Sequence, residues 1–227
     1  MFRMNFTRLC ELVAAVVLLG LPVHASVLVP GATNVPPDVF PNPGSPSLLG
    51  SLSGTFNYGG GLLTGSWQEF VVVDPLGVTC SGCLDFAFQV MIDSNAPGAI
   101  FSMNLSRFFG YTTDVGYITD SGDDAPNSVS RGAGGGLVTF NFNTDTSALI
   151  AGESSDLLVV ATNATTFDTN GILGISGGGD NQTASGQVNN LFEPTSLAPE
   201  PATILLFTLG LAAIAALRKR TNLNCRS

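Results

Sequence analysis

The side chains that could do chemistry in the body of this chain are carboxylates and one pair of cysteines. Glu69, Asp74, Asp85 and Glu153 could supply the acid and the base of a glycosidase, a reaction that needs two carboxyl groups facing each other. The only histidine, His24, lies close to the N-terminus. Without an imidazole in the body, Ser-His-Asp and Cys-His catalysis and histidine-ligated metal sites are excluded there. Because no motif brings the carboxylates together, we expect solvated surface charge and no catalytic site.

Cys80 and Cys83 form a Cys-x-x-Cys motif ahead of an expected strand. A zinc site would need two further ligands, and a thioredoxin-type motif would open a helix in a βαβ unit. Neither context is present, so we predict a local disulfide that pins a loop in an oxidising compartment.

An acidic loop offers oxygen atoms at short spacing through Asp120, Asp123 and Asp124. Oxygen atoms are the ligands that calcium prefers, but the ordered Asp-x-Asp-x-Asp-Gly pattern is missing. The loop is therefore a weak calcium candidate beside the simpler interpretation of a solvated turn, and we expect no metal or other cofactor.

Charge and composition limit the partners of this protein. The chain has 227 residues, 11% of them charged, with a net charge of −9 and a single lysine, Lys219. Residues 26–198 keep two basic side chains, Arg107 and Arg131, against 15 acidic ones, a net charge of −13. Nucleic acid needs a basic surface, so it is excluded as a partner.

The N-terminus has the pattern of a cleaved signal peptide. Arg3 and Arg8 precede an apolar run over residues 12–21, which is half the length of a membrane-spanning helix. A small-x-Ala sequence then ends at Ala25, before Ser26. We therefore predict export, with cleavage by a signal peptidase between Ala25 and Ser26.

The C-terminus combines three parts in a fixed order. A rigid Pro-Glu-Pro leads into a short apolar helix expected over residues 203–217, and a basic cluster follows. The residues of the first and third parts are Pro199, Glu200, Pro201, Arg218, Lys219 and Arg220. Basic residues at both ends stay cytoplasmic, which places the body across the membrane.

This tripartite terminus resembles the PEP-CTERM sorting signal, which exosortases read in Gram-negative bacteria that make exopolysaccharide. The resemblance implies transient anchoring in the inner membrane, processing by an exosortase, and release to the cell surface or the extracellular matrix. The same segment is sometimes labelled as an ice-binding protein C-terminal domain, a label that describes the tail alone. The body resembles the all-β proteins that often precede this signal, over residues 83–89, 110–116 and 157–165, and that resemblance brings no catalytic residues.

Apolar residues alternate with polar ones along most of the body, with the period of two that is typical of strands. We expect strands over residues 52–58, 67–73, 84–92, 101–105, 112–118, 137–143, 157–161, 172–175 and 183–188. The run at 157–161 is apolar throughout, as in a strand covered on both faces. The pattern predicts an all-β fold, a single antiparallel β-sandwich that is jelly-roll-like.

The expected organisation has five parts. They are a signal peptide (1–25), an extended Pro-rich lead-in that cannot form a ladder (26–50), a β-sandwich domain (51–190), a linker (191–198) and the sorting signal (199–220).

Three functions remain open at this point. The leading interpretation is a non-catalytic acidic domain at the cell surface or in the exopolysaccharide matrix. A polysaccharide-binding module would instead show a solvent-facing cluster of three of the rings of Trp67, Tyr58, Tyr111 and Tyr117, because sugars stack on ring faces. A carboxylate-dependent glycoside hydrolase would place two acidic side chains about 5 to 9.5 Å apart in a cleft.

Overall fold

The computed structural model describes residues 27–119, 124–142, 148–179 and 181–195, and these residues form strands and loops without a helix. The predicted all-β class is confirmed. The strands are β1 (Asp38–Phe40), β2 (Leu48–Tyr58), β3 (Leu63–Val73), β4 (Leu84–Ile92), β5 (Ala99–Leu105), β6 (Thr113–Ile118), β7 (Ser128–Arg131), β8 (Val138–Asn141), β9 (Leu157–Thr162), β10 (Phe167–Gly179) and β11 (Gln182–Pro194).

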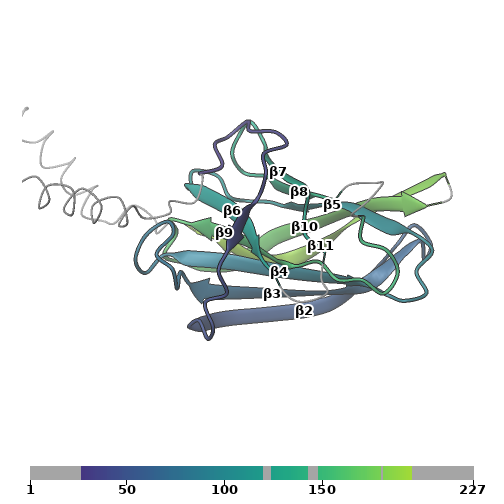
Figure 1. Cartoon of the computed structure of the whole chain (residues 1–227), viewed down its shortest axis with the longest axis horizontal. Helices are drawn as coiled ribbons and strands as arrows, with labels where there is room; N and C mark the ends of the chain where they lie inside the picture. The colour runs from purple at the N-terminus through teal and green to yellow at the C-terminus, as the bar shows by residue number, and fades with distance from the viewer. Residues whose placement is uncertain (1–26, 120–123, 143–147, 180, 196–227) are drawn as a thin grey trace, which may run out of the picture.

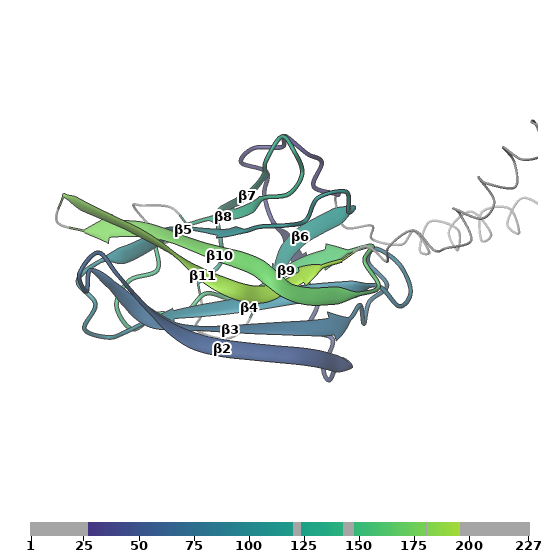
Figure 2. The same ribbon diagram turned by 180° about the vertical axis from the view of Figure 1, so that it is seen from behind.

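The strands form two sheets (Figures 1 and 2). The six-stranded sheet has the order β1-β6-β9-β4-β3-β2, and the five-stranded sheet has the order β11-β10-β5-β8-β7. Every ladder is antiparallel except that of β1 with β6. The predicted antiparallel character therefore holds for all but this edge pair. The jelly-roll-like connectivity stays a prediction.

One hydrophobic core lies between the two sheets. Phe86, Phe88 and Val90 of β4 are fully buried in it, and they meet residues of the five-stranded sheet such as Met103 and Phe140. Alternation along β4 sends the residues between them to the opposite face. The two sheets thus pack face to face across a shared apolar layer, which is the arrangement of a β-sandwich.

The structure corrects two predicted boundaries. The lead-in over residues 26–50 does form ladders: Asp38–Phe40 pair with β6, and Leu48 pairs with Val72 of β3. Proline blocks a ladder only where its own nitrogen would have to donate a hydrogen bond. The three residues of β1 lie between Pro37 and Pro41 and are not prolines, so their backbone N–H groups can donate.

The predicted linker over residues 191–198 begins too early, because β11 continues to Pro194. Leu191 and Phe192 are buried in the core, and burial of these two large side chains keeps the strand in place.

The expected signal peptide and the helix over residues 203–217 lie outside the described residues. Among those that are described, no helix has the length and apolar character needed to cross a membrane.

Arg131 at the end of β7 ties several segments together. It is 3% exposed, and its guanidinium donates to the carbonyl oxygens of Leu28 (2.8 Å), Gly135 (2.9 Å), Phe108 (3.2 Å) and Tyr111 (2.7 Å). These carbonyls belong to the N-terminal segment, the β7–β8 turn and the β5–β6 connection. Hydrogen bonds made by a charged group are stronger than neutral ones, so this buried fork stabilises the end of the sandwich.

We expect Arg131→Lys to lower the free energy of unfolding by about 3 kcal/mol or more, because a lysine cannot reach four carbonyls from one position. Urea denaturation followed by circular dichroism measures the change. The matched control is Arg107→Lys, since Arg107 is 52% exposed and its Nε lies 3.5 Å from Glu193 Oε2. That substitution should change stability by less than about 1 kcal/mol. Equal losses in the two variants would contradict the role given to Arg131.

Candidate functional site

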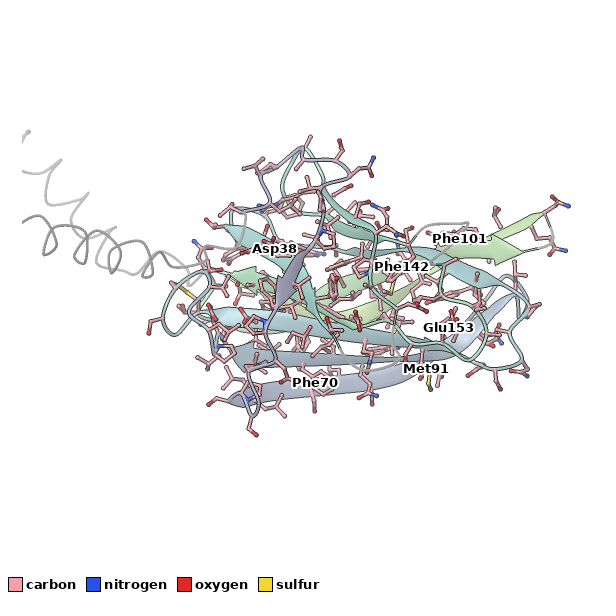
Figure 3. All side chains as sticks on the ribbon, in the orientation of Figure 1. Asp38, Phe70, Met91, Phe101, Phe142 and Glu153 are labelled. Atoms are coloured by element: carbon pink, nitrogen blue, oxygen red, sulfur yellow. A yellow bond between two sulfur atoms is a disulfide. The ribbon has the colours of Figure 1, made fainter. Side chains whose placement is uncertain are left out.

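The outer face of the six-stranded sheet, which faces away from the core, carries a hollow with an apolar floor. Strand register places Phe70, Ala87, Val159, Gly116 and Asp38 in one row across this face, from β3 to β1. Figure 3 labels the two ends of the row, Phe70 and Asp38. The small residues in its middle leave space between bulkier neighbours. Gly116 is required there, because a Cβ would collide with the backbone carbonyl of Asp38.

Two loops form the walls of this hollow. The segment after β1, with Pro43 and Pro46, runs past the ends of β4 and β3 to reach β2 (Figure 1). The β3–β4 loop contributes Pro75, Leu76 and Val78 from another side. The enclosed volume is about 320 Å³, at the lower end of the range for small-molecule pockets.

The β3–β4 loop is held by Asp74 and by the cysteine pair. Asp74 Oδ1 accepts from the backbone N–H of Leu76 (3.0 Å), and Oδ2 accepts from that of Thr79 (3.1 Å). Cys80 and Cys83 have Cα atoms 5.4 Å apart and sulfur atoms within bonding distance, which agrees with the predicted disulfide. Both features fix the loop that forms this wall.

Buried carboxyl groups lie beside the apolar floor. Register puts Asp85 and Asp114 on either side of Ala161, in the row next to that of Ala87. Asp85 is 6% exposed and Asp114 is 2% exposed. Burial raises the pKa of Asp85 to about 8, with further increases from the charges of Asp74 and Asp114. Burial, and then the charge of Asp38, raise the pKa of Asp114 to about 7.

The four carboxylates considered as a glycosidase pair are only partly brought together. Asp74 and Asp85 both belong to the region of the hollow and interact electrostatically. Glu69 is on the opposite, core-facing side of the sheet, because it pairs with Phe88. Glu153 lies in the β8–β9 connection, where its Oε2 accepts from the N–H of Ile150 (2.8 Å). An arrangement that would have Glu69 face Asp85 is therefore excluded by the sheet itself.

Glu69 is completely buried within the core. Its Oε2 accepts a hydrogen bond from the N–H of Phe192 on β11 (2.8 Å), which links the two sheets. Burial raises the pKa of Glu69 to about 8, an effect that this hydrogen bond only partly opposes. A carboxyl group with this pKa is protonated at neutral pH and acts here as a polar tie between the sheets.

The aromatic rings proposed for sugar stacking are not solvent-facing. Trp67 is buried in the core, and Tyr58 and Tyr117 are half-buried against it. Tyr111 is also half-buried. These four rings therefore do not form the exposed cluster that a polysaccharide-binding surface would need.

The calcium candidate is described only at Asp124, because Asp120 and Asp123 lie outside the described residues. The backbone of Asp124 bonds to Ser154 and Asp156 beside the start of β9. In the portions of the chain that are described, no group of three or more His, Cys, Asp or Glu side chains could hold a metal ion. The calcium site stays a prediction.

Asp38, Asp74, Asp85 and Asp114 interact electrostatically and form a carboxyl cluster beside the hollow. Sequence reasoning did not identify Asp38 and Asp114 as members of this cluster. The available signal was an aspartate inside each of two short strands, at positions where apolar residues are expected. Their juxtaposition depends on the pairing of β1 with β6, which no local pattern indicates.

The structure does not describe Ala25 and Ser26 or the residues of the tripartite C-terminus. For the C-terminus, comparison with known proteins is the relevant observation. The family model described as the PEP-CTERM protein-sorting motif matches residues 197–220. This chain carries a PEP-CTERM sorting signal. The predicted resemblance is confirmed, and the PEP-CTERM motif identifies an exported protein of the kind that an exosortase sorts. No curated protein and no solved structure matches the chain.

The buried carboxyl groups predict that this PEP-CTERM protein is more stable in mild acid than in mild base. The pKa of Glu69 and of Asp85 is raised to about 8 in the folded state, whereas in the unfolded chain these groups lose their protons near pH 4. The folded state therefore binds protons more tightly than the unfolded chain does. The stabilisation that comes from these two raised pKa values is complete below about pH 4, and it is lost as the pH rises through about 8. We expect the free energy of unfolding to fall by several kcal/mol between pH 5 and pH 9.

Glu69→Gln should reduce that slope, since glutamine keeps the acceptor for Phe192 and cannot ionise. The variant should exceed the wild type in stability at pH 9 by about 1 kcal/mol or more. Denaturant titration at pH 5 and at pH 9 measures the free energy of unfolding of each variant. The control is Glu153→Gln, which changes a half-buried glutamate in a loop. A slope that is identical in wild type and Glu69→Gln would show that Glu69 is ionised in the fold.

The cysteine pair predicts a modest effect of reduction. Replacing both Cys80 and Cys83 by serine should lower the free energy of unfolding by about 2 kcal/mol, because the closed loop is very short. Maleimide labelling of the unreduced, denatured wild type should give no adduct at either cysteine. Labelling of both would rule out the disulfide.

Proposed function

We propose that this protein is exported, processed at both ends, and delivered to the cell surface or the exopolysaccharide matrix of a Gram-negative bacterium, where its acidic β-domain acts without catalysis. The observation that carries the proposal is the PEP-CTERM motif over residues 197–220. A signal peptidase acts at Ala25–Ser26, the short C-terminal helix anchors the chain in the inner membrane, and an exosortase then removes that anchor.

The non-catalytic role is supported by what the described residues offer. They contain no histidine and no lysine. Asp74 uses both carboxyl oxygens to hold its loop, and Glu69 is sealed in the core. Neither group is placed to attack a substrate or to exchange protons with one.

The charge of the domain supports a specific kind of association with the matrix. The formal charge of residues 26–198 is −13, and it stays strongly negative when the carboxyl groups with a raised pKa keep their protons, so the domain repels acidic polysaccharide at low ionic strength. Contact with such a matrix would need neutral sugars, or divalent cations as bridges.

Mass spectrometry of the secreted fraction from the producing cells tests the proposal. We expect peptides that begin at Ser26 and none that extend beyond about Pro199, because both ends are removed during export. Peptides from intracellular membranes serve as the control and should reach Arg220. Recovery of extracellular peptides that continue through Leu217 would overturn the sorting step.

A further inference from the structure

The hollow on the outer face of the six-stranded sheet has the features of a binding site for a small molecule. Its walls are apolar apart from Asn42 and Asp85, and its floor is made by the side chains of β3, β4, β6 and β9. Leu48 and Leu76 line it and are about half-exposed, so the site opens to solvent beside them. An apolar surface of this shape gains free energy by burying an apolar ligand.

Asp85 provides an unused polar group in that apolar hollow. Its Oδ1 is buried and has no hydrogen-bond partner among the described residues. Leaving a buried carboxyl oxygen unpaired is unfavourable, because its desolvation is not compensated. A ligand that donates a hydrogen bond at this point would remove that penalty.

The charges around the hollow determine which donor fits. Asp74 of the β3–β4 loop and Asp114 of β6 act on Asp85, and Asp38 of β1 acts on Asp114. The described residues contain two basic side chains, and both have other partners: Arg107 lies beside Glu193, and Arg131 binds backbone carbonyls. The negative potential of the hollow is therefore not neutralised by a cation of the described chain.

We propose that this hollow binds an apolar molecule that carries one protonated amine, with the alkyl part on Ala87, Val159 and Phe70 and the ammonium group on Asp85. The aliphatic part matches the apolar floor, and the cation matches Asp85, the one acidic side chain among the described residues that line the hollow. The disulfide-held β3–β4 loop forms the wall beside the bound molecule. This site is independent of the processing of the two ends.

Three six-carbon probes separate the contributions of shape and charge. The full chain, kept in solution by an amphipol and shown by circular dichroism to be folded at about pH 9, is titrated at that pH with hexylammonium, hexanol and hexanoate in 0.15 M salt, with the amphipol alone as the blank. At this pH most Asp85 is ionised. We expect hexylammonium to bind at least tenfold more tightly than hexanol, and hexanoate not to bind. Methylammonium, which lacks the apolar part, should not bind.

Two variants place the binding in the hollow. Asp85→Asn should bring the affinity for hexylammonium to within about threefold of that for hexanol, while binding of hexanol persists. Ala87→Leu fills the floor and should abolish binding of both probes. Asp93→Asn, which removes an acidic charge outside the hollow, is the matched control and should leave the preference for the amine unchanged.

Measurements on the wild type keep the test decisive if a variant fails to fold. Methyl NMR signals of Ala87 and Val159 should shift on addition of hexylammonium, while that of Ala184 in the core should not. Equal affinity for amine and alcohol, absence of binding, or shifts that avoid Ala87 and Val159 would each overturn the proposal.

Discussion

The six-stranded sheet is apolar on both faces, and much of the architecture follows from the need to cover both. One face packs on the five-stranded sheet and forms the main core. The other carries Phe40, Ala87 and Val159, which make a second, smaller cluster with neighbours such as Phe70 and Leu157. Exposure of such a surface to water would be unfavourable, so it must be covered by segments outside the two sheets. The Pro-rich lead-in and the disulfide-held β3–β4 loop provide that cover, and incomplete closure between them leaves the hollow.

A shortage of basic residues governs the electrostatics. Acidic side chains are buried at several positions, yet Arg131 binds backbone carbonyl oxygens, and Arg107 lies beside Glu193. Burial without a cationic partner favours the neutral form of a carboxyl group, which is why Glu69, Asp85 and Asp114 all have a raised pKa. Arg131 is a buried cation without a carboxylate partner. Its charge is stabilised by backbone carbonyl oxygens, which accept hydrogen bonds from the guanidinium.

Local patterns in the sequence predicted most of the strands but did not predict the site. Alternation at Phe86, Phe88 and Val90 correctly predicted β4, and the continuous apolar run of β9 correctly predicted a strand covered on both faces. β7 was missed because it has four residues and only one large apolar side chain, Val129. So short a strand shows almost no alternation of apolar and polar residues. The carboxyl cluster was not predictable, because Asp85 and Asp114 meet only through the pairing of β4 and β6 with β9. Likewise, the partner of β1 lies some 80 residues along the chain, beyond the reach of any local pattern.

The extent of β11 sets how close the folded domain lies to the sorting signal. Strand β11 ends at Pro194, the sorting motif begins at residue 197, and its Pro-Glu-Pro starts at Pro199. Five residues of fully extended chain reach at most about 18 Å. This tether is shorter than the diameter of a small domain, so in the processing proposed above an exosortase acting at the Pro-Glu-Pro would have the folded sandwich directly against it. That processing would require the enzyme and this end of the domain to accommodate each other's surfaces, which would make the shape of the domain end part of the substrate.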